Sequence, residues 1–430
     1  MTAIEQGKKT GILSCWHTLK TYGLDFLLYL TCCLPFLRIL PLESDMQPYS
    51  FIVAFVYLIV HRKELFIPRF HKITFLLFAL IALIAGVQFV LDRDLSVMML
   101  IRKVYNYAAL YFVSLALVNS IKKTQGLKEN WVKFFILLWL TVGVIQLVYD
   151  REFLSFLVSN YRTNKIRGVC CLASEPSFYG YVMVFFFVLA NEFKRGKLLF
   201  QGICILQVVA LAQSAVSFVY LVVFAVMFVV SEIVHFSKYD KKQKITRLLI
   251  AAGCLVVGTV AIIIVIKTMR HTRFVEIWVN LFTRLSEINS IQSLHFIDGS
   301  IAMRVESIWL AFRGFVEMWG LPKGFGPVIF DGIDYVRIMS GYGSAIYELG
   351  IIGVVLVVLL SYNLIQGLDN GLIFGVSVSV CMFSAIQLGS PVFIFVLACA
   401  LHGREKTDML KLDIDASVKK LLMFKRKKKA

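Results

Sequence analysis

Long apolar runs constrain this chain more than any other feature of its sequence. Stretches of roughly 20 largely apolar residues recur along the whole length, and a helix needs about that many to cross a bilayer. Hydrophobic residues make up 59% of the chain, whereas soluble domains are closer to half apolar. The runs are continuous rather than alternating, which argues against a transmembrane β-barrel. We therefore predict an all-α polytopic membrane protein, with residues 1–430 forming a single transmembrane domain.

The charges between these runs predict the topology. The net charge is +18, but the basic residues lie in short loops and tails, where positive charge marks the cytoplasmic side. We therefore predict no nucleic-acid partner. The tail over residues 403–430 is strongly basic and should be cytoplasmic. The last apolar block, 371–401, is too long for one span and is interrupted at Gly389-Ser390-Pro391, so we divide it into two.

About twelve transmembrane helices result, with both termini cytoplasmic. The predicted spans cover about residues 24–42, 49–60, 73–91, 97–118, 131–149, 177–190, 198–212, 215–234, 248–266 and 343–362, and two more within 371–401.

Two long loops fall on the outer side of this topology. The first, over residues 150–176, has more basic than acidic residues, against the usual trend for that side. Pro176 suits the first position of the next helix, which needs no backbone N–H.

The second outer loop covers residues 267–342 and should contain an amphipathic helix. Asp298 or Ser300 can cap this helix, and Gly320 and Pro322 end it. We expect it to lie on the membrane surface or to pack on the spans. Its apolar residues recur at helical spacing: Val305, Ile308, Trp309, Phe312, Phe315 and Trp319.

Three short motifs occur in a fixed order on this frame. The first is Arg167-Gly168 followed by Glu175-Pro176-Ser177. The second is Asp298-Gly299-Ser300, then Arg304, Gly320 and Gly324-Phe325-Gly326, and the third is the stretch from Gly343 to Gly353. Together they resemble the bacterial O-antigen polymerase (Wzy-type) family, which belongs to the O-antigen ligase/polymerase superfamily.

This resemblance implies a GT-C-like integral-membrane glycosyltransferase of lipopolysaccharide or other surface polysaccharide biosynthesis. It would join oligosaccharide repeat units carried on undecaprenyl pyrophosphate, at the periplasmic face of the bacterial inner membrane. The implied partners are this lipid-linked oligosaccharide, membrane lipid and a polysaccharide chain-length regulator. No cofactor is implied.

The chemistry of such a transfer selects candidate residues. A diphosphate leaving group needs fixed positive charge, and arginine binds phosphate oxygens through its planar fork. Arg167 and Arg304 are the main candidates, and Arg162 and Arg102 are secondary ones. The outer loops contain no carboxylate cluster at metal-ligand spacing, so we predict that the reaction is metal-independent.

An acceptor hydroxyl must also lose its proton to a base. Glu175 is our candidate for the base or for a residue that orients it, and His295 is the competing candidate. Gly320, Gly324 and Tyr342 complete the predicted substrate-binding set.

Each of these residues also has a structural interpretation. Arg167 can anchor the chain at the headgroups, Arg304 can pair with a helical glutamate, and Glu175 can favour a helix N-terminus. Tyr342 can belong to the aromatic belt at the membrane interface.

Two alternative functions remain open. An O-antigen ligase would attach finished polymer to a lipid A core. A lipid-linked oligosaccharide transporter is a different class, in which broken helices usually occur at matching positions of two halves. In this sequence the breaks are unpaired.

Overall fold

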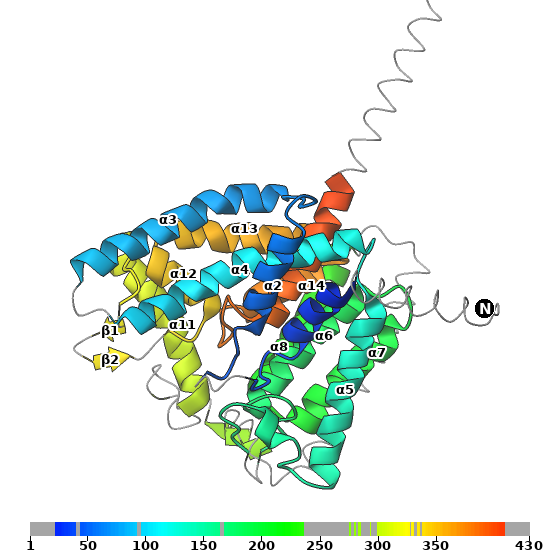
Figure 1. Cartoon of the computed structure of the whole chain (residues 1–430). Helices are drawn as coiled ribbons and strands as arrows, with labels where there is room; N and C mark the ends of the chain where they lie inside the picture. The colour runs from blue at the N-terminus through cyan, green and yellow to red at the C-terminus, as the bar shows by residue number, and fades with distance from the viewer. Residues whose placement is uncertain are drawn as a thin grey trace, which may run out of the picture.

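The computed structural model describes residues 22–39, 44–92, 96–163, 167–235, 299–326, 328–330, 333–335 and 338–408, together with positions 275–276, 279–280, 283–284 and 293. These parts are predominantly helical (Figure 1). In chain order, the helices are Tyr22–Cys33, α2 (Tyr49–Val60), α3 (Arg69–Leu91), α4 (Val97–Lys123), α5 (Glu129–Val148), η1 (Ser155–Leu157), α6 (Pro176–Asn191), α7 (Lys197–Leu206), the π-helical η2 (Gln207–Ala212), α8 (Ala215–His235), α11 (Gly299–Glu317), α12 (Gly341–Leu349), α13 (Ile351–Gly367), α14 (Gly371–Cys381) and a last helix over 391–408. Two short strands, β1 (Val328–Phe330) and β2 (Ile333–Tyr335), form an antiparallel pair.

The helices pack as two groups joined by α14. In the first group, α4 packs against α2 and α3, and α12 packs against α11 and α13. In the second, α6 packs against α7 and α8, and α5 against α7 (Figure 1). Because α14 packs against both α13 and α8, it connects the two groups.

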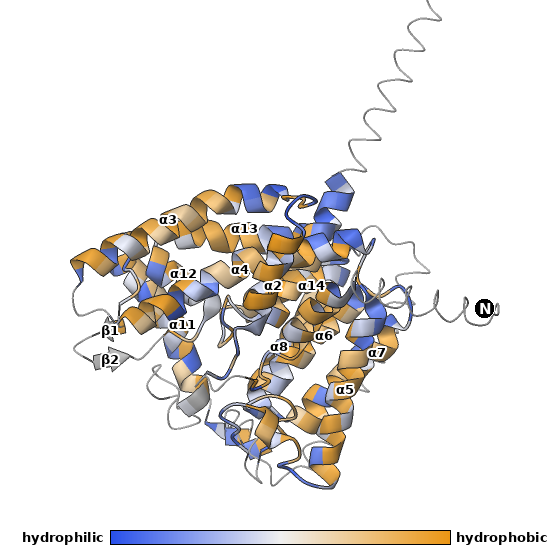
Figure 2. Ribbon diagram, in the orientation of Figure 1, coloured by the Kyte–Doolittle hydropathy of each residue, from blue (hydrophilic) through white to orange (hydrophobic). Residues whose placement is uncertain are grey.

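The helices have the character of a membrane protein. Among the described residues, α3, α4, α5 and α8 are long and apolar enough to cross a bilayer, and several other helices are apolar but shorter. Apolar residues remain on the outside of α3, where Leu76 is 67% and Leu83 61% exposed (Figure 2). Such a surface suits lipid rather than water. The helical membrane class predicted from the sequence therefore agrees with the structure.

The first predicted span, 24–42, is wrong at its C-terminal end, because the helix stops at Cys33. Pro35 has no N–H to continue the helix and disfavours helical geometry at the residue before it. The chain instead turns back: the Pro35 carbonyl accepts from Gln47 N at 2.8 Å, and Arg38 N donates to Leu157 O at 2.6 Å. We call this end of the bundle, where residues 44–48, 150–163 and 167–175 lie, the loop end.

The predicted span over 343–362 is also wrong in being continuous, since it divides into α12 and α13 at Gly350. This glycine has a φ of +58°, which side chains disfavour. A Cβ at Gly350 would lie 2.2 Å from the Gly320 carbonyl oxygen. The break therefore lets the chain after α11 approach the junction of α12 and α13.

The break predicted at Gly389-Ser390-Pro391 is present but longer than expected. Residues 382–390 are non-helical, and the last helix begins at Pro391. This break supports the start of α12, since Tyr342 N donates to Met382 O at 3.0 Å. A Cβ at Gly341 would lie 2.3 Å from the Ile386 carbonyl oxygen.

The helix predicted within 267–342 corresponds to α11. Its packed face is not the large apolar stripe read from the sequence. The buried positions include Ala302, Ser307, Leu310 and Ala311, whereas Trp309 and Phe312 are 45% and 46% exposed. Most of these positions carry small side chains, which allow α11 and α12 to approach closely, and Leu310 packs in the same cluster as Tyr347 of α12.

Candidate functional site

Arg162 lies between two carboxylates at the loop end. Its NH1 donates to Glu175 Oε1 at 2.6 Å, and its NH2 lies 3.3 Å from Asp45 Oδ1. The Arg162 side chain is 55% exposed, and the two carboxylates are 22% and 23% exposed. The group therefore combines three charges from two distant segments of the chain and carries one net negative charge.

Glu175 is the residue immediately before α6, and its carboxylate does not cap that helix. One oxygen binds Arg162, and the other accepts from Ser177 Oγ at 3.2 Å. The backbone of Glu175 is extended, with a φ of −144° and a ψ of 155°, but its side chain makes no hydrogen bond to the first helical N–H groups. The helix-dipole interpretation therefore does not account for its contacts.

Two tyrosines lie within electrostatic range of Asp45 and of Arg304. Tyr181, in the second turn of α6, lies within electrostatic range of Asp45 and of Tyr220. The Tyr220 hydroxyl, on α8, is hydrogen-bonded to Ser384 Oγ in the break between α14 and the last helix. Arg304, half-buried on α11, lies within electrostatic range of Tyr220.

The backbone next to Arg167 is held against the end of η2. The Arg167 carbonyl accepts from Arg151 NH1 at 2.9 Å. The next residue, Gly168, packs so closely on Ala212 that an added Cβ would lie 2.1 Å from the Ala212 carbonyl oxygen. Arg167 and Glu175 both lie within electrostatic range of the Cys170 thiol, so these two predicted site residues share one region of the loop end.

The cysteines near this group are poor nucleophiles. Burial raises the pKa of the Cys170 thiol to about 12, and burial likewise raises the pKa of Cys171. Both thiols therefore stay protonated near neutral pH. Among the described residues, no three His, Cys, Asp or Glu side chains come together as metal ligands.

The remaining candidates lie in different surroundings. Tyr342 is fully buried, with its ring against Phe383 at 5.3 Å between centroids, so it packs the interior. Gly320 and Gly324, with φ of +77° and +83°, shape the turn after α11. Arg102 is exposed near the start of α4. His295 falls outside the described residues.

A buried ion pair that sequence reasoning missed fixes the turn after α11. Lys103 Nζ lies 3.3 Å from Glu348 Oε1 and donates to Gly326 O at 3.0 Å. Tyr107 donates to the other Glu348 oxygen at 2.7 Å, and Gly324 N donates to the Glu348 carbonyl at 3.0 Å. The available sequence signal was a lysine and a glutamate within apolar runs, which usually indicates a pair.

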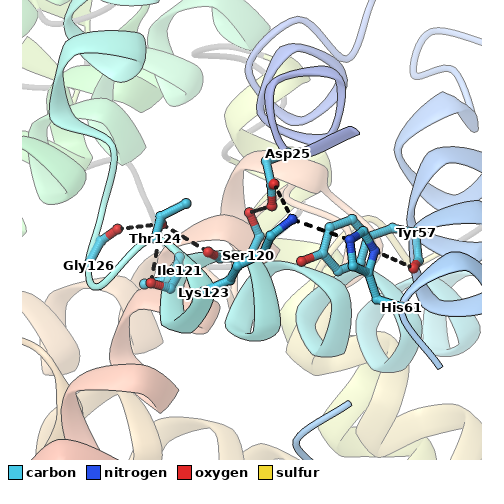
Figure 3. Close-up of polar contacts among 8 residues, drawn as sticks. All are labelled: Asp25, Tyr57, His61, Ser120, Ile121, Lys123, Thr124 and Gly126. Atoms are coloured by element: carbon cyan, nitrogen blue, oxygen red, sulfur yellow. Dashed lines mark hydrogen bonds and ion pairs between the residues drawn. The ribbon is translucent and has the colours of Figure 1, made fainter. Parts of the chain in front are cut away.

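A second missed network lies at the opposite end of the bundle. Asp25 is fully buried and accepts from Ser120 Oγ at 2.5 Å and from Lys123 Nζ at 3.1 Å (Figure 3). Lys123 also lies 3.2 Å from His61 Nε2, and His61 Nδ1 lies 3.1 Å from the Tyr57 carbonyl. These contacts join the helix Tyr22–Cys33 to α2 and α4. Their reach across three helices indicates a structural role.

Comparisons with protein-family models, with curated proteins and with solved structures find no match to this chain.

Proposed function

We propose that this protein is a membrane-embedded glycosyltransferase, a surface-polysaccharide polymerase of the O-antigen type. It joins repeat units carried on undecaprenyl pyrophosphate, at the periplasmic face of a bacterial inner membrane. In this proposal the chain crosses the membrane about twelve times, with a GT-C-like arrangement, cytoplasmic termini and a periplasmic loop end. The observations that support the proposal are that Arg167 and Glu175 both lie within electrostatic range of the Cys170 thiol, and that Arg304 lies within electrostatic range of Tyr220 on α8.

The proposed reaction needs these groups in distinct roles. The acceptor hydroxyl oxygen bonds to the anomeric carbon of the donor, while the bond from that carbon to the diphosphate oxygen breaks. The bonding electrons leave with the diphosphate, whose growing negative charge is offset by Arg304 and Arg167. The hydroxyl proton passes to Glu175 and then to water. In this scheme, fixed arginines supply the positive charge without a metal ion.

Polymer ladders from a deletion strain test this proposal. Arg304→Met should remove the ladder, since losing one charge-stabilising donor costs about 100- to 1,000-fold in rate. Arg313→Met is the matched control, because Arg313 lies on the same helix, paired with Glu317 at 2.7 Å. It should retain the ladder. Equal ladders from both variants would remove Arg304 from the mechanism.

The same strain separates the related functions. Loss of a polymerase leaves single repeat units, whereas loss of a ligase leaves long polymer on its lipid carrier. Loss of a transporter leaves neither product at the outer face. For the base, full ladders from both Glu175→Gln and His295→Ala would reject both assignments.

A further inference from the structure

Arg162 is divided between two carboxylates, unlike Lys103 and Lys123 in their ion pairs with Glu348 and Asp25. NH1 donates to Glu175 and NH2 donates to Asp45, so neither carboxylate forms a bidentate pair with the guanidinium. Lys103 and Lys123, by contrast, bind carboxylates that are at most 9% exposed. Arg162 is 55% exposed, so solvent and solutes can reach it.

An exposed ion pair of this kind is weak and can be exchanged. Exposed pairs contribute about 0.2–1 kcal/mol, because water screens the charges and side-chain entropy opposes the contact. A phosphate group binds the arginine fork through two oxygens at once and carries more charge than a carboxylate. A diphosphate therefore competes well for Arg162 against single contacts from Glu175 and Asp45.

We propose that Arg162 is an exchangeable partner, bound to Glu175 and Asp45 in the free protein and to diphosphate when the donor arrives. This inference rests on the proposed function and deepens it. The exchange would free the Glu175 oxygen that Arg162 occupies, while Ser177 Oγ still holds the other oxygen at 3.2 Å. Glu175 then accepts the acceptor proton only when a donor is bound. The base is thereby coupled to the presence of the leaving group.

This exchange predicts that removing either carboxylate strengthens ligand binding, because both carboxylates compete with the ligand for Arg162. Glu175→Gln and Asp45→Asn should each bind inorganic pyrophosphate about two- to fivefold more tightly than the original protein, the range for an exposed pair. Arg162→Met should bind it at least about tenfold more weakly, since a charge-assisted contact is lost. If Glu175 instead helps to hold the ligand, its replacement weakens binding.

Isothermal titration of full-length protein in nanodiscs with inorganic pyrophosphate, at fixed pH and salt, measures these affinities. Glu317→Gln is the matched control, because it releases an arginine from an exposed contact of 2.7 Å on α11. Its affinity should be unchanged. Tightening in Glu317→Gln as well would indicate a general charge effect and overturn the exchange.

The outcomes separate the two proposals. Unchanged or weaker binding by Glu175→Gln and Asp45→Asn overturns the exchange, while the ladder assay still judges the polymerase. Tighter binding in both, with polymer still made by a deletion strain, supports the exchange and rejects the polymerase. If the unsubstituted protein binds no pyrophosphate, the exchange is overturned outright.

Discussion

Replacing Glu192 with glutamine should stabilise the protein at alkaline pH and scarcely change it at acidic pH. Glu192 follows the last residue of α6, and its Oε1 accepts from Asp369 N at 3.0 Å and from Asn191 Nδ2 at 3.2 Å. Burial, followed by the nearby Asp369 charge, raises the pKa of the Glu192 carboxyl to about 7. The folded protein therefore holds this proton more tightly than the unfolded chain does.

The size of the effect follows from the two pKa values. A carboxyl whose pKa rises on folding stabilises the protein fully below its unfolded pKa of 4.5, and this contribution is lost as the pH rises to about 7. The charged Glu192 then costs roughly 3 kcal/mol at pH 8 but under about 1 kcal/mol at pH 5. With an unfolding entropy of about 0.9 kcal/mol/K for a chain of this length, Glu192→Gln should raise the unfolding midpoint by about 3 °C at pH 8 and about 1 °C at pH 5.

Thermal unfolding of the purified proteins in one detergent, at both pH values, measures this difference. Asp369→Asn removes the neighbouring charge but leaves the burial of Glu192, so it should give a smaller rise at pH 8. Glu64→Gln, which removes an exposed carboxylate, is the control for the change of charge, and its midpoint should match that of the original protein. A midpoint for Glu192→Gln at or below that of the original protein at pH 8 would refute the reasoning, because the carboxylate would then be stabilised by folding.

Two further predictions concern the loop end. Lys103→Met should lower stability by about 3–5 kcal/mol, because it leaves the buried Glu348 carboxylate without its cation, and adding Glu348→Gln should recover most of that loss in the same unfolding assay. Gly168→Ala should lower both the unfolding midpoint and polymer yield, because its Cβ would lie 2.1 Å from the Ala212 carbonyl oxygen. Gly202→Ala, whose Cβ would meet nothing within 4 Å, should leave both unchanged or raise the midpoint slightly.

Local sequence signals predicted many of the helix boundaries well. The expected span 215–234 corresponds to α8, Ala215–His235, and Pro176 begins α6 at its first position as expected. Prolines and glycines act on the backbone of their own neighbourhood, so their effect can be read without knowing the fold. The break at Gly350 depends on a distant segment, because Gly350 packs against Gly320, and the sequence did not predict it.

Side-chain partners were harder to predict, because they depend on which helices meet. Tyr107 and Glu348 are 241 positions apart, and Lys123 and Asp25 are 98 positions apart. Hydrophobic periodicity could not choose the packed face of α11 either. The aromatic stripe of α11 can face lipid as well as protein. The face that packs against α12 instead contains small residues that allow a close approach.

The placement of charge separates fixed parts of the molecule from its exchangeable part. Where a carboxylate is almost fully buried, as at Asp25 and Glu348, it has a lysine and a hydroxyl partner, since an unpaired charge there would be too costly. At the loop end, Arg162 and Glu175 form a short contact in partial exposure, where separation costs little. A site that must bind and release a charged ligand needs partly exposed ion pairs that separate easily. The helices around it are held in place by buried ion pairs. If buried pairs fix the frame, breaking Lys103–Glu348 should displace Arg304 through α11, whereas breaking Arg162–Glu175 should change ligand affinity and leave the unfolding midpoint nearly unaltered.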